Sequence, residues 1–71
     1  MERQPVSSTI VASIGYDKAS AVLEVEFVSG AVYQYFDVPG EVYFEVMAAK
    51  SIGKVMTSGV IGRFRFARLI S

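Results

Sequence analysis

Residues 21–36 read AVLEVEFVSGAVYQYF, and this stretch decides the fold. Apolar residues alternate with polar ones on both sides of Ser29 and Gly30, which predicts two antiparallel strands joined by a tight turn. A two-residue primed turn of type I′ would force Ser29 to a positive φ. A type I turn over Val28 and Ser29, followed by a left-handed Gly30, avoids that strain. We therefore expect a G1 bulge at Gly30.

This turn sets which residues share a face of the sheet. It pairs Val25 with Tyr33 and Leu23 with Tyr35, so both tyrosines lie on the apolar side. We therefore interpret Tyr33 and Tyr35 as core residues rather than as an exposed pair of stacking rings. The expected apolar face consists of Ile10, Ala12, Ile14, Leu23, Val25, Phe27, Tyr33 and Tyr35. The opposite face is expected to combine Glu24, Glu26 and Gln34 with Val11, Val22, Val28, Val32 and Phe36.

The flanking sequence adds a strand before this hairpin and a helix after it. Alternation over residues 7–16 predicts a first strand, and a four-residue turn after it pairs Ile14 with Leu23. Pro39 suits the first turn of a helix, because the missing N–H of proline has no partner there. The stripe of this helix that faces the sheet would comprise Val42, Val46 and Ala49, joined by Tyr43 and Met47.

The remaining sequence is less regular. Residues 54–58 predict a short second helix that Gly59 ends, and residues 61–70 alternate weakly, as either a fourth strand or an extended tail would. Residues 1–6 lack periodicity and are expected to form a flexible N-terminal arm. We predict an α+β fold in which a three-stranded antiparallel β-meander is followed by one main helix, a short second helix and a C-terminal strand or tail. Residues 7–71 would form a single domain.

Composition excludes most chemistry. The chain has 71 residues with no cysteine and no histidine, which removes disulfides, thiolate zinc sites and the usual neutral-pH general base. We expect no catalysis, no cofactor, no metal and no small-molecule substrate. No apolar run is long enough to span a membrane and the start does not resemble a signal peptide, so we expect a cytoplasmic protein without membrane contact. Because 52% of the residues are hydrophobic, the chain needs either a dense core or an association surface.

The charges are divided along the chain although their sum is zero. All seven acidic residues precede position 46. The only cations in residues 1–49 are Arg3 and Lys18, so this part of the chain carries 2 − 7 = −5. Residues 50–71 hold five cations and no acid, which gives +5. Such asymmetry indicates a polyanionic or acidic partner, or two parts that attract each other within the fold or across a dimer.

Two groups of residues are candidates for contact with a partner. Aromatic rings stack on bases while cations meet phosphates, so cations interleaved with aromatics indicate a nucleic-acid surface. The candidate nucleic-acid-binding residues are Lys50, Lys54, Arg63, Phe64, Arg65, Phe66 and Arg68. The competing interpretation of residues 63–68 is an edge strand with buried phenylalanines and solvated arginines. Candidate self-association residues on the half-apolar face are Val22, Val32 and Phe36.

The ordered set of motifs resembles the KTSC domain. The residues that carry the resemblance are Gly15-Tyr16-Asp17, Leu23-Glu24-Val25-Glu26-Phe27, Gly30, Tyr33-Gln34-Tyr35, Val38-Pro39, Val42-Tyr43, Ala49 and Ser51-x-Gly53-Lys54. The resemblance extends over most of the chain, and the family is named for a C-terminal extension of some lysyl-tRNA synthetases. That context implies RNA binding. Ile52 and Ile61 stand where the family often has cations, which weakens the basic edge of this member.

Two functions therefore remain open from the sequence. The first is a non-enzymatic RNA-binding accessory domain that binds weakly and without sequence preference. The second is a protein-interaction or homo-oligomeric module without nucleic-acid binding. Neutral net charge favours the second slightly, because nucleic-acid-binding domains are typically basic.

Overall fold

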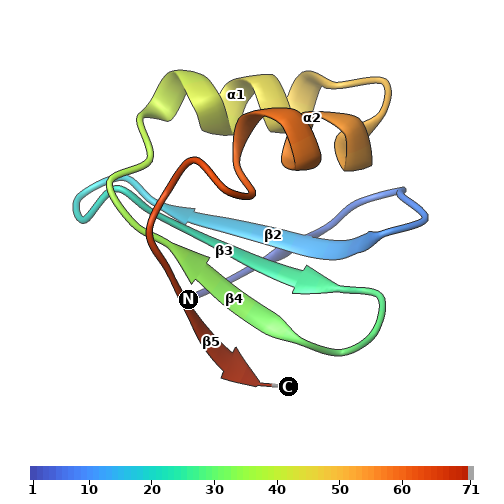
Figure 1. The fold of residues 1–71 in the computed structure, drawn as a ribbon, viewed down its shortest axis with the longest axis horizontal. Coiled ribbons are helices and arrows are strands. Elements are labelled where there is room, and N and C mark those ends of the chain that lie inside the picture. The colour runs from blue at the N-terminus through green and yellow to red at the C-terminus, as the bar shows by residue number, and fades with distance from the viewer. Residues whose placement is uncertain (71) are drawn as a thin grey trace.

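The fold is a sheet covered on one face by helices. A computed structural model describes residues 1–70, and within them five antiparallel strands lie side by side in chain order. The strands are β1 (Gln4–Pro5), β2 (Val11–Asp17), β3 (Val22–Phe27), β4 (Val32–Tyr35) and β5 (Phe66–Ile70). The helices α1 (Gly40–Ala48) and α2 (Ile52–Gly59) follow β4 and lie on the same face (Figure 1).

The β3–β4 hairpin has the predicted register. Val25 pairs with Tyr33 and Leu23 pairs with Tyr35. The N–H of Gly30 donates to the carbonyl of Phe27 at 2.9 Å, and Gly30 has φ +97°. The G1 bulge is therefore confirmed, and glycine is needed at this position because only it adopts this φ without strain.

The β2–β3 register differs from the prediction by two residues. Ile14 pairs with Val25 instead of Leu23, because the loop lies one residue later and ends at Ala21. Ala21 adopts φ 57°, and its carbonyl accepts a hydrogen bond from the N–H of Val38 at 2.9 Å. A shift of two residues keeps each side chain on its predicted face, so the core assignment of Ile14 survives.

A bulge near the start of β2 reverses the assignment of Val11. The register shifts between Val11 and Ser13, so Ala12 is an extra residue and Val11 pairs with Phe27. Val11 is consequently fully buried, whereas Ile10, which we expected on the core face, is 46% exposed. The simple alternation failed here because an extra residue changes the side of every residue before it.

The N-terminal segment is part of the sheet. Gln4 pairs with Ile14 and Pro5 with Ser13, so within the described residues four strands precede the helices, and the predicted number of three is wrong. A Cβ atom added to Gly15 would lie 2.5 Å from the carbonyl oxygen of Glu2, so the segment expected to be a loose arm packs directly against Gly15. Glycine is required because the arm approaches the strand so closely.

The helices pack on the apolar face of the sheet. Within α1, Val46 is fully buried, whereas Phe44 points away from the sheet and is 71% exposed. The second helix starts two residues before the predicted position, since the Ser51 hydroxyl caps it by accepting from the N–H of Lys54. The core comprises Val11, Ile14, Leu23, Val25, Tyr35, Val38, Val46, Ile52, Met56 and Val60.

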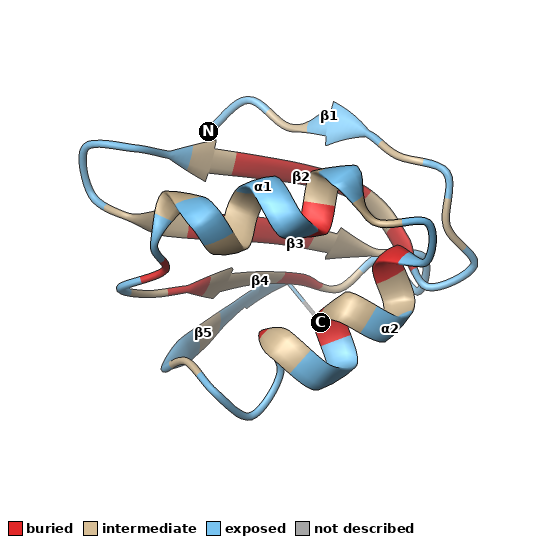
Figure 2. Ribbon diagram, turned by 90° about the horizontal axis from the view of Figure 1, so that it is seen from above, coloured by how far each residue is buried: buried red, intermediate tan, exposed pale blue. Residues whose placement is uncertain are grey.

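The C-terminal segment is a strand, which settles the choice between strand and tail. Phe66 pairs with Tyr35 and Arg68 pairs with Tyr33. Figure 2 shows that β5 extends beyond the cover of the helices, and most of its residues are exposed. The helix-facing side of the sheet is therefore partly open along β4 and β5.

Candidate nucleic-acid interface

The five candidate cations do not form a single cluster. Lys50 and Lys54 lie at the start of α2, whereas the arginines lie in and before β5. Arg65 binds Asp37 at 2.8 Å, and its guanidinium lies 5.9 Å from the centre of the Phe36 ring. Because neighbouring residues of a strand point to opposite faces, Arg65 lies on the other side of the sheet from Arg68.

The predicted aromatic residues also separate. Phe64 is half-buried and packs against the core, with the Arg63 guanidinium 6.0 Å from its ring centre. Phe66 is 59% exposed and lies beside Tyr33, at a ring-centre distance of 5.6 Å. Residues 63–68 thus agree in part with the competing interpretation of an edge strand, with one phenylalanine half-buried against the core and one exposed.

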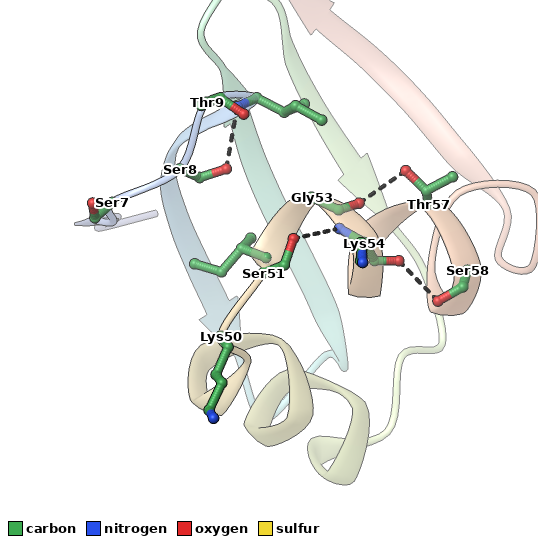
Figure 3. Close-up of a pocket in the computed structure, with 11 residues that line it drawn as sticks. Ser7, Ser8, Thr9, Lys50, Ser51, Gly53, Lys54, Thr57 and Ser58 are labelled. Carbon is green, nitrogen blue, oxygen red and sulfur yellow. Dashed lines mark hydrogen bonds between the residues drawn. The ribbon is translucent and has the colours of Figure 1, made fainter.

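A pocket lies between α2 and the segment that precedes β2; we call it the lysine pocket (Figure 3). Its volume of about 840 Å³ is within the range of ligand sites in proteins. It is lined by Ser7, Ser8, Thr9, Ile10, Lys50, Ser51, Ile52, Gly53, Lys54, Thr57 and Ser58. The Ser51 hydroxyl and the first N–H groups of α2 stand on one side, and hydroxyls of the preceding loop stand on the other (Figure 3).

A groove on the open part of the helix-covered face adjoins this pocket; we call it the tyrosine groove. It is lined by Thr9, Ile10, Phe27, Val28, Ser29, Ala31, Tyr33, Tyr35, Ile61 and Arg68. Arg68 donates from Nε and from Nη2 to the Tyr33 hydroxyl at 2.9 and 2.7 Å, and its guanidinium lies 5.3 Å from the centre of that ring. The Phe27 ring meets the Tyr33 ring edge to face. The groove therefore has an aromatic floor and one fixed cation.

Thr9 and Ile10 form the wall that the pocket and the groove share. A Cβ atom on Gly53 would lie 2.8 Å from Cδ1 of Ile10, so Ile10 rests directly on α2. The lining residues of both depressions include Lys50, Lys54 and Arg68, and none of these described residues is acidic. The structure thus gathers three cations on one continuous surface of a chain that is neutral overall.

The sequence predicted the position of Tyr35 correctly and that of Tyr33 only in part, and it did not predict the wall that the pocket and the groove share. Tyr35 is 3% exposed and lies in the core, but Tyr33 is half-buried and forms the groove floor. Burial raises the pKa of Tyr35, which keeps its phenol neutral. The sequence predicts Thr9 and Ile10 as part of a strand, with Ile10 on its core face, and no local pattern marks them as lining a binding surface.

The opposite face of the sheet carries a polar network instead of an apolar patch. Arg3 binds the carboxylate of Glu24 and donates from Nε to the Ser13 hydroxyl at 3.0 Å. Gln34 donates to Glu24 at 2.9 Å, and Ser13 donates to Glu26 at 2.9 Å. Burial raises the pKa of Glu24, but the hydrogen bonds from Gln34 and Arg3 and the charge of Arg3 lower it by more, so the net shift is downward.

The candidate self-association residues share this covered face. Val32 is 3% exposed, so it is not part of an accessible surface, and Val22 and Phe36 are each half-buried. The physical reason is that the N-terminal arm, which we expected to be loose, and β5, which we expected as either a strand or a tail, extend the sheet on both sides of the face we expected to be open.

Metal and membrane features are absent from the part of the chain that the structure describes. Residues 1–70 contain no group of three or more carboxylates arranged to hold a metal ion. Neither α1 nor α2, the helices of this region, has the length and apolar character that crossing a membrane requires.

Several known proteins are similar to this chain in sequence. A protein of Tsukamurella paurometabola is 41% identical over 66 residues, which are 93% of this chain and 98% of the relative. An uncharacterized protein of Stutzerimonas stutzeri is 44% identical over 54 residues, 76% of each chain. A lysine–tRNA ligase of Nostoc punctiforme is 33% identical over 61 residues, which are 86% of this chain and 11% of the ligase.

The architecture defines a class of small α+β domain, in which helices cover one face of an antiparallel sheet and leave a basic pocket beside an aromatic groove. A crystal structure of a KTSC domain protein from Yersinia pestis has this fold, with a TM-score of 0.94 and 37% identity over 96% of both chains. The chain belongs to the KTSC domain family, whose domain matches residues 7–64. The resemblance found in the sequence is confirmed.

Proposed function

We propose that this protein is a non-enzymatic module that binds single-stranded RNA, with backbone phosphates at the lysine pocket and a base in the tyrosine groove. The observation that carries the proposal is the charge of this surface. Its lining residues include three cations and no carboxylate, although the chain has seven acidic residues. The neutral total charge is therefore a poor guide, because phosphates respond to the local field.

The lysine pocket suits a phosphate backbone. Lys50 and Lys54 supply positive charge, and within residues 1–70 neither lysine forms an ion pair with a carboxylate. Hydroxyls of Ser7, Ser8 and Thr9 line the facing wall and can donate to phosphate oxygens. Phosphate contacts of this kind supply affinity without reading sequence.

The tyrosine groove suits an unpaired base. It is lined by the half-buried ring of Tyr33 and by two isoleucines, Ile10 and Ile61, which are 46% and 43% exposed. Two hydrogen bonds hold the Arg68 guanidinium at the Tyr33 hydroxyl, 5.3 Å from the centre of that ring, where it lines the groove. Single-stranded RNA offers unstacked bases that pack on aromatic rings and on arginine planes, which a duplex does not. The similarity to part of an enzyme named as a lysine–tRNA ligase supports an RNA ligand.

Titration of a labelled single-stranded RNA at several salt concentrations tests the proposal. If Lys50 and Lys54 each meet one phosphate, the slope of log affinity against log salt should be about −1.4, from roughly −0.7 per contact. Lys54→Gln should reduce the magnitude of that slope by about 0.7. The matched control is Lys18→Gln, which removes an exposed lysine of the β2–β3 loop and should leave the slope unchanged.

A second pair of variants tests the groove. Tyr33→Leu should weaken binding about tenfold or more without changing the salt slope, because stacking of one base contributes about 1–3 kcal/mol. Phe44→Leu removes an equally aromatic but 71% exposed side chain of α1 and should have no effect on binding. Absence of binding at low salt, or equal losses in the test and control variants, would show that this surface does not bind RNA.

A further inference from the structure

The two edges of the sheet differ in their ability to accept another strand. The β1 edge is two residues long and contains Pro5, which has no N–H to donate. The β5 edge is five residues long. Phe36 donates to the carbonyl of Arg65 at 2.9 Å, so alternation turns the backbone groups of Phe66 and Arg68 away from β4. Within the described residues, no strand pairs with that side of β5.

The side chains of β5 leave this edge unguarded. Charged residues on an edge strand normally prevent further pairing. Here Arg65 is bound to Asp37, and Arg68 is folded back over Tyr33. The large apolar residues of the strand are exposed instead, at 59% for Phe66, 51% for Leu69 and 58% for Ile70. The edge therefore combines unpaired backbone groups with apolar surface.

We propose that β5 pairs antiparallel with β5 of a second copy across a two-fold axis, so that one sheet continues through both copies. A second copy is the partner because the strand is complementary to itself. The short, proline-containing β1 edge does not offer β5 an alternative partner, so the contact is isologous and closes as a dimer.

The side chains select the register of this pairing. With Ala67 on the two-fold axis, Phe66 faces Arg68 of the partner subunit, which allows a cation–π contact on each side of the axis. With Arg68 on the axis, the two arginines would face each other, and like charges opposite each other destabilise a sheet. Leu69 is an extra residue between Arg68, which pairs with Tyr33, and Ile70, which pairs with Val32. Regular pairing with β4 is therefore limited to residues 66–68, whose midpoint is Ala67. The register centred on Ala67 fits that stretch.

This inference does not rest on the proposed RNA binding, although Arg68 belongs to both surfaces, because it concerns a mass that can be measured without RNA. Sedimentation equilibrium from about 10 µM to about 1 mM should show a monomer–dimer equilibrium, as suits a small interface. Phe66→Glu and Phe66→Lys make a matched pair, since both remove the same exposed ring. The glutamate variant should dimerise roughly tenfold more tightly than the lysine variant, because two opposite-charge pairs with Arg68 replace two like-charge pairs.

Cysteine cross-linking tests the register. The chain has no cysteine, so Ala67→Cys introduces a single thiol. On the axis of a non-hydrogen-bonded antiparallel pair, two such thiols lie close enough for a disulfide. Mild oxidation should cross-link this variant much faster than Lys18→Cys, an exposed control on the β2–β3 loop. A monomer mass throughout the concentration range, or cross-linking no faster than in the control, would overturn the proposal.

Discussion

Arg3→Met tests whether the N-terminal arm is held to the sheet by a buried ion pair. Arg3 binds Glu24, whose side chain is 6% exposed, and it also donates to Ser13. Removal of the guanidinium therefore leaves a buried carboxylate with only the hydrogen bond from Gln34. Methionine keeps much of the apolar stem, so the change isolates the charge and its hydrogen bonds.

The magnitude follows from these contacts. Breaking a fully buried pair costs about 3–5 kcal/mol, and a hydrogen bond to a charged group is worth about 1.5–3 kcal/mol. Arg3 is 27% exposed and Gln34 still donates to Glu24, so the lower part of this range applies. We expect the free energy of unfolding to fall by about 2 kcal/mol at pH 7.

The pH dependence gives a second, sharper readout. In the native protein the pKa of Glu24 is lowered, so its contribution to stability is present above the ordinary value of 4.5 and is lost as the pH falls below it. Arg3→Met removes the arginine's hydrogen bond and charge while burial still raises this pKa. The difference in the free energy of unfolding between the unaltered protein and Arg3→Met should therefore be largest at pH 7 and should become smaller below pH 4.5.

Urea unfolding followed by circular dichroism at pH 7 and at about pH 3 measures both effects. The control is Arg63→Met, which removes an exposed arginine and should change stability by less than about 0.5 kcal/mol. Addition of Glu24→Gln to Arg3→Met should recover part of the loss, because no buried charge then remains. Equal stability of the two methionine variants, or a loss in Arg3→Met that is the same at both pH values, would refute this account of the arm.

Other substitutions test the core, the backbone and the shared wall. Tyr35→Ala should lower the free energy of unfolding by about 3 kcal/mol, because the ring is 3% exposed in the core; a loss below about 1 kcal/mol in urea unfolding would contradict that placement. Ala21→Gly should raise the melting temperature slightly, since Ala21 has φ 57° and left-handed backbone costs a residue with a Cβ about 1–2 kcal/mol; a lower melting temperature would count against strain there. Gly53→Ala should leave stability nearly unchanged but weaken RNA binding, because the new Cβ displaces the flexible end of Ile10 while alanine favours the helix. Unaltered RNA affinity in that variant would show that Ile10 is not part of the binding surface.

The sequence predicted those parts of the fold that depend on neighbouring residues. The strain of a positive φ at Ser29 indicated the G1 bulge, and the bulge determined that Val25 faces Tyr33. Pro39 and the spacing of apolar residues located α1 and turned Phe44 outward. These features were predictable because turn geometry and helical periodicity act over a few residues.

The site was predictable only in its ingredients. The charge pattern predicts Lys50, Lys54 and Arg68 as binding residues, but it groups them with Arg63 and Arg65, which lie elsewhere in the structure. Strand pairing sends Arg65 to the opposite face, where it binds Asp37. No local pattern predicts the role of Thr9 and Ile10. They form the wall between the lysine pocket and the tyrosine groove, whose other lining residues come from distant parts of the chain.

By itself the sequence determined the hairpin, the helix positions and the absence of cysteine and histidine chemistry. The tertiary structure decided that Val11 is buried and Ile10 is exposed, because the bulge at Ala12 reverses the alternation of the residues before it. It also decided that Gln4 and Pro5 pair with β2, next to Arg3, whose guanidinium binds the carboxylate of Glu24, 21 positions away. Such contacts between distant residues leave no periodic trace in the sequence, and their energy exists only once the strands are paired.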